Sequence, residues 1–558
     1  MSQASRKTQI GRTLLIAIFA AIAMLPIYWN GVPVGNDQTQ HFQFAATVYN
    51  SVMSGDIYPS FAAATNHGLG DYGLRFYPPL TYYALSAAFF VVRDWYFAGI
   101  ICFSLIFFAG GIGIYLWARE EFAPPPALIA VILYIFAPYH LNQLYNNGLF
   151  AEFFATAIIP FCFLCLTRTT RNGRWIDVLG LAIAYSLLIL THLPMTIICS
   201  VAMGIYALLL IRKLNAVVIV FRLLLAVIAA TSMTSFYWAR WLPEIDWIAH
   251  SSPKYFSTTW DYRANFLLLP DHFLKYGEDV LNLWFADIFL VSTLLIAIPT
   301  VVYLFRKKIP ASKFMLAIAA MLILTVFLTT PLSSLVWDNA GFLQKVQFPW
   351  RWLAIIVSFG AVFASVGIVR MSEDMKKSKN LLIPLGLGSV LVVFFSTAAF
   401  VTKGASFVSH QDLNRQMTTI SESDSCECWL PVWAERKAFI QTEKVVAEDR
   451  TVEVISWTAT VKTFRIEPGK PEPAAVAAFY YPRWQASING RDVPVEMTDG
   501  GAISIAIPAE ASDIKLAFRE PAYVAAAKYA SFATWLFVLV FTVILLIKSR
   551  KRLPPAAA

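Results

Sequence analysis

An acid and a histidine lie four residues apart near the N-terminus, in the segment Gly35-Asn-Asp37-Gln-Thr-Gln-His41. Residues 42–53 have helical character, and positions four apart on a helix lie on one face. A carboxylate at this point can simply cap the helix that it precedes. It can also act as a general base, because partial removal of water makes a carboxylate more basic. Both interpretations stay open from these residues alone.

Further charged side chains of the same loop stand beside small residues. His67 and Asp71 flank Gly68-Leu-Gly70, and Arg75 opens the run Arg75-Phe-Tyr-Pro-Pro-Leu80. A glycine pair can let the backbone approach a ligand, although it is also typical of an ordinary turn. Asp71 is therefore a weak candidate site acid, and Arg75 is a candidate cation for an anionic ligand.

A second candidate cation lies much later in the chain. Arg351 stands between two tryptophans in Phe348-Pro-Trp-Arg-Trp352. A guanidinium is suited to bidentate phosphate binding, but Arg and Trp also gather at membrane boundaries whatever the function. The remaining cations considered for this role are Arg240, Arg263 and Lys345.

Two more polar residues lie at the ends of apolar segments. Glu152 begins one such segment, and a carboxylate beside hydrocarbon usually faces an interior or a watery cavity. It could bind the hydroxyl groups of a ligand, order a site or accept a metal, or it could be a charge favoured at a helix N-terminus. His192, two residues before Pro194, could contact a polar ligand or satisfy a loop.

The composition identifies the elements that must position these residues. Of 558 residues, 58% are hydrophobic and only 14% are charged, with a mean hydropathy of +0.59. These values exclude a cytosolic enzyme, a disordered chain, collagen and a coiled coil, and indicate a polytopic α-helical membrane protein. Cytoplasmic Lys and Arg account for the net charge of +9, so no nucleic acid is expected.

Apolar runs of about 15 to 22 residues predict about twelve spans. The Lys and Arg content of the short loops places both termini in the cytoplasm. The long loops 30–94, 239–284, 331–350 and 401–526 then lie outside, with all seven histidines. The run 79–92 is too short for a span and is expected to be an interfacial or re-entrant helix. The spans lie near 13–29, 95–117, 125–138, 152–167, 176–191, 193–211, 219–238, 285–305, 312–330, 351–369, 381–400 and 527–547.

The last outer segment is predicted to be a small domain. Residues 1–400 form the transmembrane domain, 401–526 an extracytoplasmic domain that is β-rich from 451, and 527–558 the final helix and a basic tail. Asn489-Gly490 is typical of a two-residue hairpin turn. A small antiparallel sandwich is expected, with strands at 452–457, 461–466, 475–480, 484–488, 493–496, 503–507 and 514–518.

The order of these motifs resembles a known group of bacterial membrane proteins. They are the YfhO-type proteins and those named "6-pyruvoyl-tetrahydropterin synthase-related", both of which are similar to the GT-C superfamily of glycosyltransferases. This sequence departs from the pattern of that group at two positions. Ser60-Phe61 stands where the pattern has an aromatic residue, often Trp, and Asn147 stands where it usually has an Arg. The matching segments are Asp37 to His41, Gly55-Asp-Ile-Tyr-Pro59, Gly68-Leu-Gly70, Phe76-Tyr-Pro-Pro-Leu80, Leu144-Tyr-Asn-Asn-Gly-Leu-Phe-Ala-Glu152, Thr191-His-Leu-Pro194, Gln347-Phe-Pro-Trp-Arg-Trp352 and Tyr480-Tyr-Pro-Arg-Trp484 with Asn489-Gly490.

The resemblance implies transfer of a sugar, with inversion, from a polyprenyl-phosphate donor to a glycan, lipid or protein acceptor outside the bacterial inner membrane. By position Asp37 would be the general base. The residues expected to bind substrate or phosphate are His41, Arg75, Glu152, His192 and Arg351. The alternatives are a transporter or flippase of lipid-linked saccharides and a non-catalytic assembly partner.

Two points concern cofactors and cysteines. No cofactor is certain, but some branches of the superfamily use a divalent ion, and Asp37, Asp71 and Glu152 could supply oxygen ligands. Cys426 and Cys428 form the only outer cysteine pair, and bonding them together would make a strained ring. Two free thiols or an intermolecular bond therefore remain open.

Overall fold

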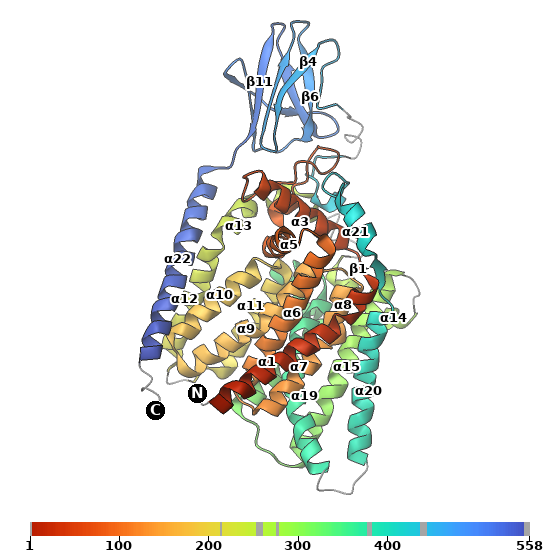
Figure 1. The fold of residues 1–558 in the computed structure, drawn as a ribbon, viewed down its shortest axis with the longest axis vertical. Coiled ribbons are helices and arrows are strands. Elements are labelled where there is room, and N and C mark those ends of the chain that lie inside the picture. Colours follow the sequence, from red (N-terminus) through yellow and green to blue (C-terminus); the bar gives the residue numbers. More distant parts are fainter. Residues whose placement is uncertain are drawn as a thin grey trace.

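A computed structural model describes residues 3–212, 215–252, 260–274, 278–375, 382–435 and 443–551. Part of the expected basic tail, 552–558, lies outside these ranges. A bundle of helices carries a β-sandwich beyond one end, which we call the β-domain end (Figure 1). Helix α1 begins, and the long final helix α22 ends, toward the opposite end of the bundle (Figure 1).

Apolar sequence accounts for most of the bundle. Nine helices of the described residues are long and apolar enough to cross a membrane, or ten if the bent pair α16 and Pro331–Asn339 forms one span. The expected spans at 13–29 and 176–191 fall on α1 with α2 and on α10, which do not pass this test. The bounds are α1 Gln3–Ala23, α2 Leu25–Asn30, α3 Gln38–Met53, α4 Gly73–Phe76, α5 Leu80–Val92, α6 Trp95–Ala118, α7 Pro124–Ile135, α8 Pro138–Tyr145, α9 Phe150–Asn172, α10 Trp175–Ile189, α11 Leu193–Leu210, α12 Ala216–Met233, α13 Ser235–Trp241, α14 Pro270–Leu274, α15 Glu278–Arg306, α16 Lys313–Thr329, α17 Ser334–Asn339, α18 Gly341–Gln344, α19 Leu353–Met375, α20 Leu382–Lys403, α21 His410–Met417 and α22 Ala522–Lys551.

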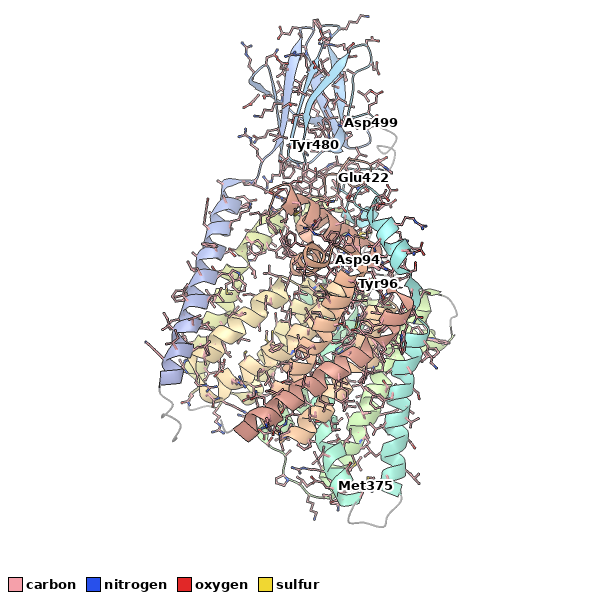
Figure 2. The ribbon with its side chains drawn as sticks, viewed as in Figure 1. Asp94, Tyr96, Met375, Glu422, Tyr480 and Asp499 are labelled. Carbon is pink, nitrogen blue, oxygen red and sulfur yellow. A yellow bond between two sulfur atoms is a disulfide. The ribbon has the colours of Figure 1, made fainter. Side chains whose placement is uncertain are left out.

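Helix α19 is the central helix of the bundle. Its span is almost wholly buried, and it packs against α7, α15 and α16. The side chains fill the bundle along its length, and Met375, at the C-terminal end of α19, lies at the end opposite the sandwich (Figure 2). Leu353 therefore begins α19 near the β-domain end, directly after the short 3-10 helix η7, Pro349–Trp352.

The short apolar run 79–92 forms α5, a helix of 13 residues. It packs against α3 and α6 and lies at the β-domain end (Figure 1). Arg93 ends it in a left-handed conformation with a φ of 56°, and Asp94 begins α6 by accepting a hydrogen bond from the backbone N–H of Phe97 at 3.0 Å.

The β-rich domain is an antiparallel sandwich, as predicted. One sheet has the order β3-β6-β10-β9 and the other β4-β5-β11-β7-β8, and side chains of both share one core. Asn489 and Gly490 have φ values of 49° and 81° between paired Ile488 and Arg491, which confirms the two-residue hairpin. The strands are β3 Val445–Val446, β4 Val452–Trp457, β5 Val461–Ile466, β6 Glu472–Phe479, β7 Trp484–Ile488, β8 Arg491–Val493, β9 Glu496–Met497, β10 Ala502–Ile507 and β11 Ser512–Phe518.

A buried ion network joins the first loop to the sandwich. Arg75 binds Glu244 through Nε and Nη2, at 2.5 and 2.9 Å, and binds Glu520 through Nη1 and Nη2, at 2.6 and 2.8 Å. Arg483 donates to Glu244 at 2.7 Å, and Ser60 donates to Glu520 at 2.9 Å. We call these residues the ion network. Ser60, which stands where the family pattern has an aromatic residue, is part of it.

A small two-stranded sheet holds the first loop to the end of α20. Strands β1, Val32–Val34, and β2, Ser406–Val408, pair antiparallel. The carbonyl oxygen of Val408 would lie only 2.0 Å from a Cβ at Gly31, so the close approach of these strands requires a glycine there. The strand just before Asp37 is thereby anchored to the segment that follows α20.

Candidate functional site

A cavity of about 1610 Å³ opens at the β-domain end. Polar side chains from α3, α8, the start of α11 and η7 line it, together with apolar side chains from α11, α15 and the residue before α14. The polar group includes Asp37, Asn142, Gln143, Asn147, His192 and Arg351, and the apolar group includes Leu193, Ile197, Leu269, Leu283, Ala286 and Phe289. An arrangement of this kind suits a ligand with a polar head and an apolar chain.

Asp37 stands at the N-cap position of α3, yet its side chain makes no capping hydrogen bond. The capping interpretation therefore does not explain this residue. The half-buried carboxylate lines the cavity and receives no hydrogen bond from the described residues. Burial raises the pKa of Asp37 to about 6, the charge of Arg351 opposes the rise, and the charge of Glu152 adds to it. Asp37 therefore remains mostly ionised at neutral pH and is more basic than an exposed aspartate.

Two glycines bring Asp37 to this wall. A Cβ at Gly35 would lie 2.3 Å from the backbone nitrogen of Gly148, so no larger residue fits between the first loop and the turn that joins α8 to α9. Gly148 has a φ of 62°, which a glycine adopts without strain. The backbone N–H of Asp37 donates to the carbonyl of Asn147 at 3.4 Å. The Gly-Asn-Asp and Asn-Gly motifs thus position the acid.

Arg351 lines the same cavity and is held from behind by Glu152. Its Nε donates to Glu152 at 2.9 Å and its Nη1 to the carbonyl of Val346 at 2.6 Å. The guanidinium lies over the rings of Phe348 and Trp350, at 4.8 and 5.6 Å from their centroids. Its Nη2 has no hydrogen-bond partner among the described residues, and it is the nitrogen left for a ligand.

Glu152 is not itself part of the cavity lining. It is 1% exposed and also accepts hydrogen bonds from Tyr139, at 2.6 Å, and from Gln143. Because its oxygens are already bonded, Glu152 neutralises and orients Arg351 and does not present a free carboxylate to a ligand. The side-chain amide of Asn147 donates to the side-chain oxygen of Gln143 at 2.8 Å and so extends the hydrogen bonds around Glu152.

His192 lines the cavity from the N-cap position of α11. Its Nδ1 accepts a hydrogen bond from the backbone N–H of Met195 at 3.3 Å, so the neutral ring carries its proton on Nε2. Burial lowers the pKa of His192, and the charges of Arg351 and His41 lower it further. His192 is therefore a neutral hydrogen-bond donor at neutral pH.

His41 lies one helical turn beyond Asp37, whose carbonyl accepts its backbone N–H at 3.0 Å. The imidazole stacks on Phe150 at 5.4 Å between centroids, and its Nδ1 lies 3.0 Å from the hydroxyl of Tyr82. Burial lowers the pKa of His41 to about 3. The ring is therefore neutral at neutral pH, and its Nε2 is buried without a partner in the described structure.

Besides Glu152, two further predicted site residues do not line the cavity. Arg75 is wholly buried in the ion network, where four hydrogen bonds to carboxylates occupy its guanidinium. Asp71 is wholly buried and accepts the backbone N–H of Gly73 at 2.6 Å. Burial raises the pKa of Asp71 to about 7, against hydrogen bonding from Gly73, Ser425 and Gln40. Neither residue is in position to contact a ligand bound beside Asp37.

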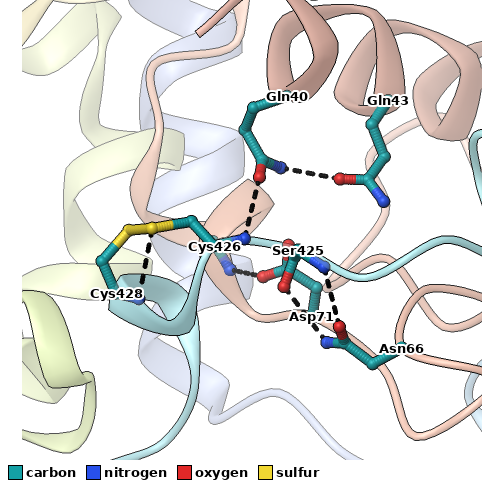
Figure 3. The surroundings of a disulfide bond; sticks show 8 residues. Gln40, Gln43, Asn66, Asp71, Ser425, Cys426 and Cys428 are labelled. Carbon is teal, nitrogen blue, oxygen red and sulfur yellow. Dashed lines mark hydrogen bonds between the residues drawn. A yellow bond between two sulfur atoms is a disulfide. The ribbon is translucent and has the colours of Figure 1, made fainter. Parts of the chain in front are cut away.

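Cys426 and Cys428 form a disulfide with each other, which answers the question that the sequence left open. Figure 3 shows the bond beside Gln40 of α3, whose side-chain oxygen accepts the backbone N–H of Cys426 at 3.3 Å. Ser425 binds Asn66 through its backbone N–H, at 2.8 Å, and through its hydroxyl, at 3.1 Å. The segment with the disulfide thus closes one side of the cavity, which both cysteines line.

Sequence reasoning missed several lining residues, among them His250, His272 and Gln347. The histidines were expected only to share one face, and four of the seven do line the cavity: His41, His192, His250 and His272. Among the described residues no group of three or more His, Cys, Asp or Glu side chains could hold a metal ion. Of the three acids considered as metal ligands, only Asp37 lines the cavity.

Known proteins that resemble the chain include an uncharacterized protein of Lactococcus lactis subsp. cremoris (strain MG1363). It is 24% identical over 205 residues, which are 36% of this chain and 33% of the relative. The chain therefore spans about a third of the length of that relative.

Among solved structures, the apo oligosaccharyltransferase of Archaeoglobus fulgidus is 13% identical with a TM-score of 0.40, over 74% of this chain and 58% of its own. Arabinofuranosyltransferase AftD from Mycobacteria is 13% identical with a TM-score of 0.42, over 70% and 27%. ArnT from Cupriavidus metallidurans bound to undecaprenyl phosphate is 12% identical with a TM-score of 0.37, over 73% and 77%.

The family model of a membrane protein domain described as 6-pyruvoyl-tetrahydropterin synthase related matches residues 74–401. The match covers more than half of the 558 residues and includes the helices α5 to α19 and most of α20. The chain belongs to this family of 6-pyruvoyl-tetrahydropterin synthase-related membrane proteins.

Proposed function

We propose that this protein is a membrane glycosyltransferase that moves a sugar from a polyprenyl-phosphate donor to an acceptor hydroxyl in the cavity. The main support for the proposal is that two groups line the same cavity. One is the carboxylate of Asp37, which accepts no hydrogen bond from the described residues, and the other is the guanidinium of Arg351. The apolar lining side chains of α11 and α15 offer surface for the polyprenyl chain. The order of sequence motifs that resembles the GT-C superfamily supports the same reaction class.

The reaction is a single displacement at the anomeric carbon. Asp37 accepts the proton of the acceptor hydroxyl while the oxygen forms its bond to that carbon. The bond from the anomeric carbon to the phosphate oxygen breaks, and the polyprenyl phosphate leaves with the electron pair. Arg351 stabilises the charge that develops on the phosphate. Attack from the side opposite the phosphate inverts the configuration of the sugar.

The two histidines and Glu152 support these roles. In this proposal the Nε2–H of His192 donates to a sugar hydroxyl or to the phosphate, and His41 offers a neutral ring near Asp37. Glu152 is a positioning residue that acts through Arg351. The distribution of Lys and Arg supports a location in the bacterial inner membrane, with the β-domain end outside the cytoplasm.

The proposal is tested by transfer in proteoliposomes. The purified protein is supplied with a labelled polyprenyl-phosphate sugar and with envelope glycan or lipid as acceptor. Formation of a labelled, inverted product and release of polyprenyl phosphate are the expected results. Movement of the labelled donor across the bilayer without product would instead identify a flippase.

The pH dependence of transfer follows from Asp37. The ionised form is the base, so kcat/KM is expected to fall as the pH falls through about 6, the pKa of Asp37, and to level off above it. The fall approaches about tenfold per pH unit because only the ionised fraction reacts. Initial rates between about pH 4 and pH 8 test this, with protein integrity checked by size-exclusion chromatography at each pH. A profile that stays flat through pH 6 would contradict the assignment.

A conservative change at Arg351 is expected to weaken transfer. Arg351→Lys keeps the charge but loses the planar fork, and kcat/KM is expected to drop about 10- to 100-fold with the loss of one charge-assisted hydrogen bond to phosphate. Initial rates at varied donor concentration measure the effect. The matched control is Arg415→Lys, because Arg415 is exposed and pairs with Asp412 outside the cavity. Equal rates for the two variants would remove Arg351 from the phosphate site.

A further inference from the structure

The disulfide between Cys426 and Cys428 takes no part in the mechanism above, although it lies in the wall of the cavity. Both cysteines line the cavity, and only Glu427 stands between them in the chain. The other four of the six cysteines are free thiols on the helices α6, α9 and α11. Among the described lining residues, this pair is therefore the only sulfur that can undergo thiol chemistry.

The two bonded cysteines differ in their exposure to solvent. Cys426 is exposed, whereas Cys428 is only 4% exposed. Exchange of a disulfide begins with attack of a thiolate on one of its sulfurs, and its rate depends on access to that sulfur. Exposed disulfides are accordingly the ones that tend to be labile and to serve regulation or catalysis. Cys426 is the residue of this pair that an incoming thiolate can reach.

A backbone N–H points at the sulfur of the exposed cysteine. The N–H of Cys428 donates to Sγ of Cys426 at 3.3 Å (Figure 3). A hydrogen bond to the charged form of a group favours that form, and the thiolate is the reactive form of cysteine. The arrangement thus combines an exposed cysteine whose thiolate is favoured with a buried cysteine close enough to resolve a mixed disulfide.

The disulfide belongs to a segment, 421–430, that forms one wall of the cavity and that we call the wall segment. The first loop and α3 hold its beginning. The backbone N–H of Asn66 donates to the carbonyl of Ser423 at 3.2 Å, and the side chain of Gln43 donates to the same carbonyl at 2.9 Å. The part before the disulfide is therefore fixed independently of the bond between the two sulfurs.

The turn that carries the disulfide also places a tryptophan in the cavity wall. The backbone N–H of Trp429 donates to the carbonyl of Cys426 at 3.0 Å, and that of Leu430 donates to Glu427 at 3.1 Å. The ring of Trp429 stacks on His250, with 4.9 Å between centroids, and both rings line the cavity. The disulfide is the covalent tie across this turn, so its loss frees the turn next to Trp429.

We propose that the disulfide is a thiol–disulfide exchange site, which a dithiol reductant opens at Cys426, and that its opening loosens Trp429 in the cavity wall. A thiolate of the dithiol attacks Sγ of Cys426, the bond between the two cysteine sulfurs breaks, and Cys428 leaves as a thiolate and takes up a proton. The second thiolate of the dithiol then attacks its own sulfur in the mixed disulfide and releases Cys426. The dithiol is oxidised by two electrons to a disulfide, and the cysteine pair is reduced to two thiols.

The exchange is tested by thiol labelling of the folded full chain in nanodiscs, with dithiothreitol as the dithiol. A maleimide that carries a polyethylene glycol mass tag is expected to label two more thiols after reduction than before it. The exposed Cys426 in the variant Cys428→Ser should react about tenfold or more faster than the buried Cys428 in Cys426→Ser. The matched control is Cys165→Ser, because Cys165 is a half-buried free thiol outside the cavity lining, and this variant should respond to dithiothreitol as the wild type does.

Two results of the labelling would contradict the proposal. If the pair becomes reactive only after the protein is unfolded in dodecyl sulfate, the disulfide is a structural bond and not an exchange site. If the two single variants are labelled at equal rates, Cys426 is not the preferred point of attack. The count of thiols in the wild type decides the first question even where a serine variant fails to fold.

The loosening of the wall is tested by hydrogen–deuterium exchange followed by mass spectrometry. The backbone N–H groups of Trp429 and Leu430 should exchange faster after reduction, because the turn loses its covalent tie. Strand β11 in the core of the sandwich should exchange at an unchanged rate. A variant with serine at both cysteine positions should exchange as fast as the reduced wild type, with or without dithiothreitol. Equal exchange in the turn before and after complete reduction would overturn the effect on Trp429.

The consequence for catalysis rests on the proposed function. Since Arg351 and the apolar side chains of α11 and α15 are assigned to the donor, the wall segment is left to the acceptor. Reduction is expected to raise the KM of the acceptor about 2- to 10-fold, because a loosened side chain must be ordered on binding, with the KM of the donor and kcat nearly unchanged. An unchanged acceptor KM would overturn this consequence. Oxidised protein without any transfer would overturn the proposed function, while labelling and hydrogen exchange would still decide the exchange site.

Discussion

Asp37→Asn is expected to abolish sugar transfer and to leave the protein folded. Loss of a positioned general base lowers a rate by about 10²- to 10⁴-fold, and asparagine has nearly the same shape as aspartate without its basicity. The fold should lose little, because the Asp37 side chain makes no capping hydrogen bond and accepts none from the described residues. Transfer in proteoliposomes measures the rate, and thermal unfolding of the purified variant measures stability.

The control for this change is Asp412→Asn. Asp412 is a largely exposed acid of α21 that pairs with Arg415 and lies outside the cavity lining, so its variant should retain full transfer. Undiminished transfer by Asp37→Asn would remove Asp37 from the role of base. Transfer lost together with the folded state would also contradict the prediction, because it would show that Asp37 acts in folding.

Arg75→Met is expected to destabilise the joint between the helical bundle and the sandwich. Removing one partner of a buried ion pair costs about 3–5 kcal/mol, although Arg483 would still pair with Glu244 and Arg240 with Glu520. Glu244 is wholly buried and Glu520 is 18% exposed, so both carboxylates would lose their main partner. The measurement is the free energy of unfolding from urea titration of the solubilised protein, followed by tryptophan fluorescence.

The matched control is Arg465→Met on the surface of the sandwich. Arg465 pairs with Asp513 at 2.7 Å, but both side chains are about half-exposed, and such pairs contribute only about 0–1 kcal/mol. Arg75→Met should therefore be clearly less stable than Arg465→Met. A stable Arg75→Met protein with a raised KM for the donor would instead revive Arg75 as a phosphate ligand.

The ion network is also expected to withstand mildly acidic conditions. Burial alone would raise the pKa of Glu520, but hydrogen bonds and ion pairing with Arg75, together with the charge of Arg240, lower it to about 2. A lowered carboxyl pKa stabilises the folded state above the ordinary value of 4.5, and this contribution is lost as the pH falls through about 2. The fall in transfer near pH 6 therefore belongs to Asp37 and not to unfolding of this joint.

Features that depend on local sequence were predictable. Apolar runs predicted the helices because the length of a span and its hydrophobicity are properties of one continuous segment. Alternating side chains predicted the strands, and 452–457, 461–466 and 484–488 coincide with β4, β5 and β7. The turn at Asn489-Gly490 was predictable because only its two central residues need positive φ.

Features that join distant segments were not predictable from spacing. Strands β1 and β2 pair although helices α3 to α20 lie between them in the chain, and Glu152 binds Arg351, 199 residues away. Arg75 has the same residue type as Arg351, and nothing in its flanking sequence shows that two distant carboxylates occupy it. His272 and Asp287 are 15 residues apart, and the only local sign was an acid within an apolar run.

The sequence by itself determined that this protein is a helical membrane protein with a β-sandwich before its last helix, because hydrophobic periodicity acts over a few residues at a time. It also singled out Asp37 and Arg351 as residues able to perform the proposed chemistry. Only the tertiary structure decided which polar groups line the cavity and which are neutralised by one another. The physical reason is that the state of a buried charge depends on the partners that long-range packing brings within hydrogen-bonding distance.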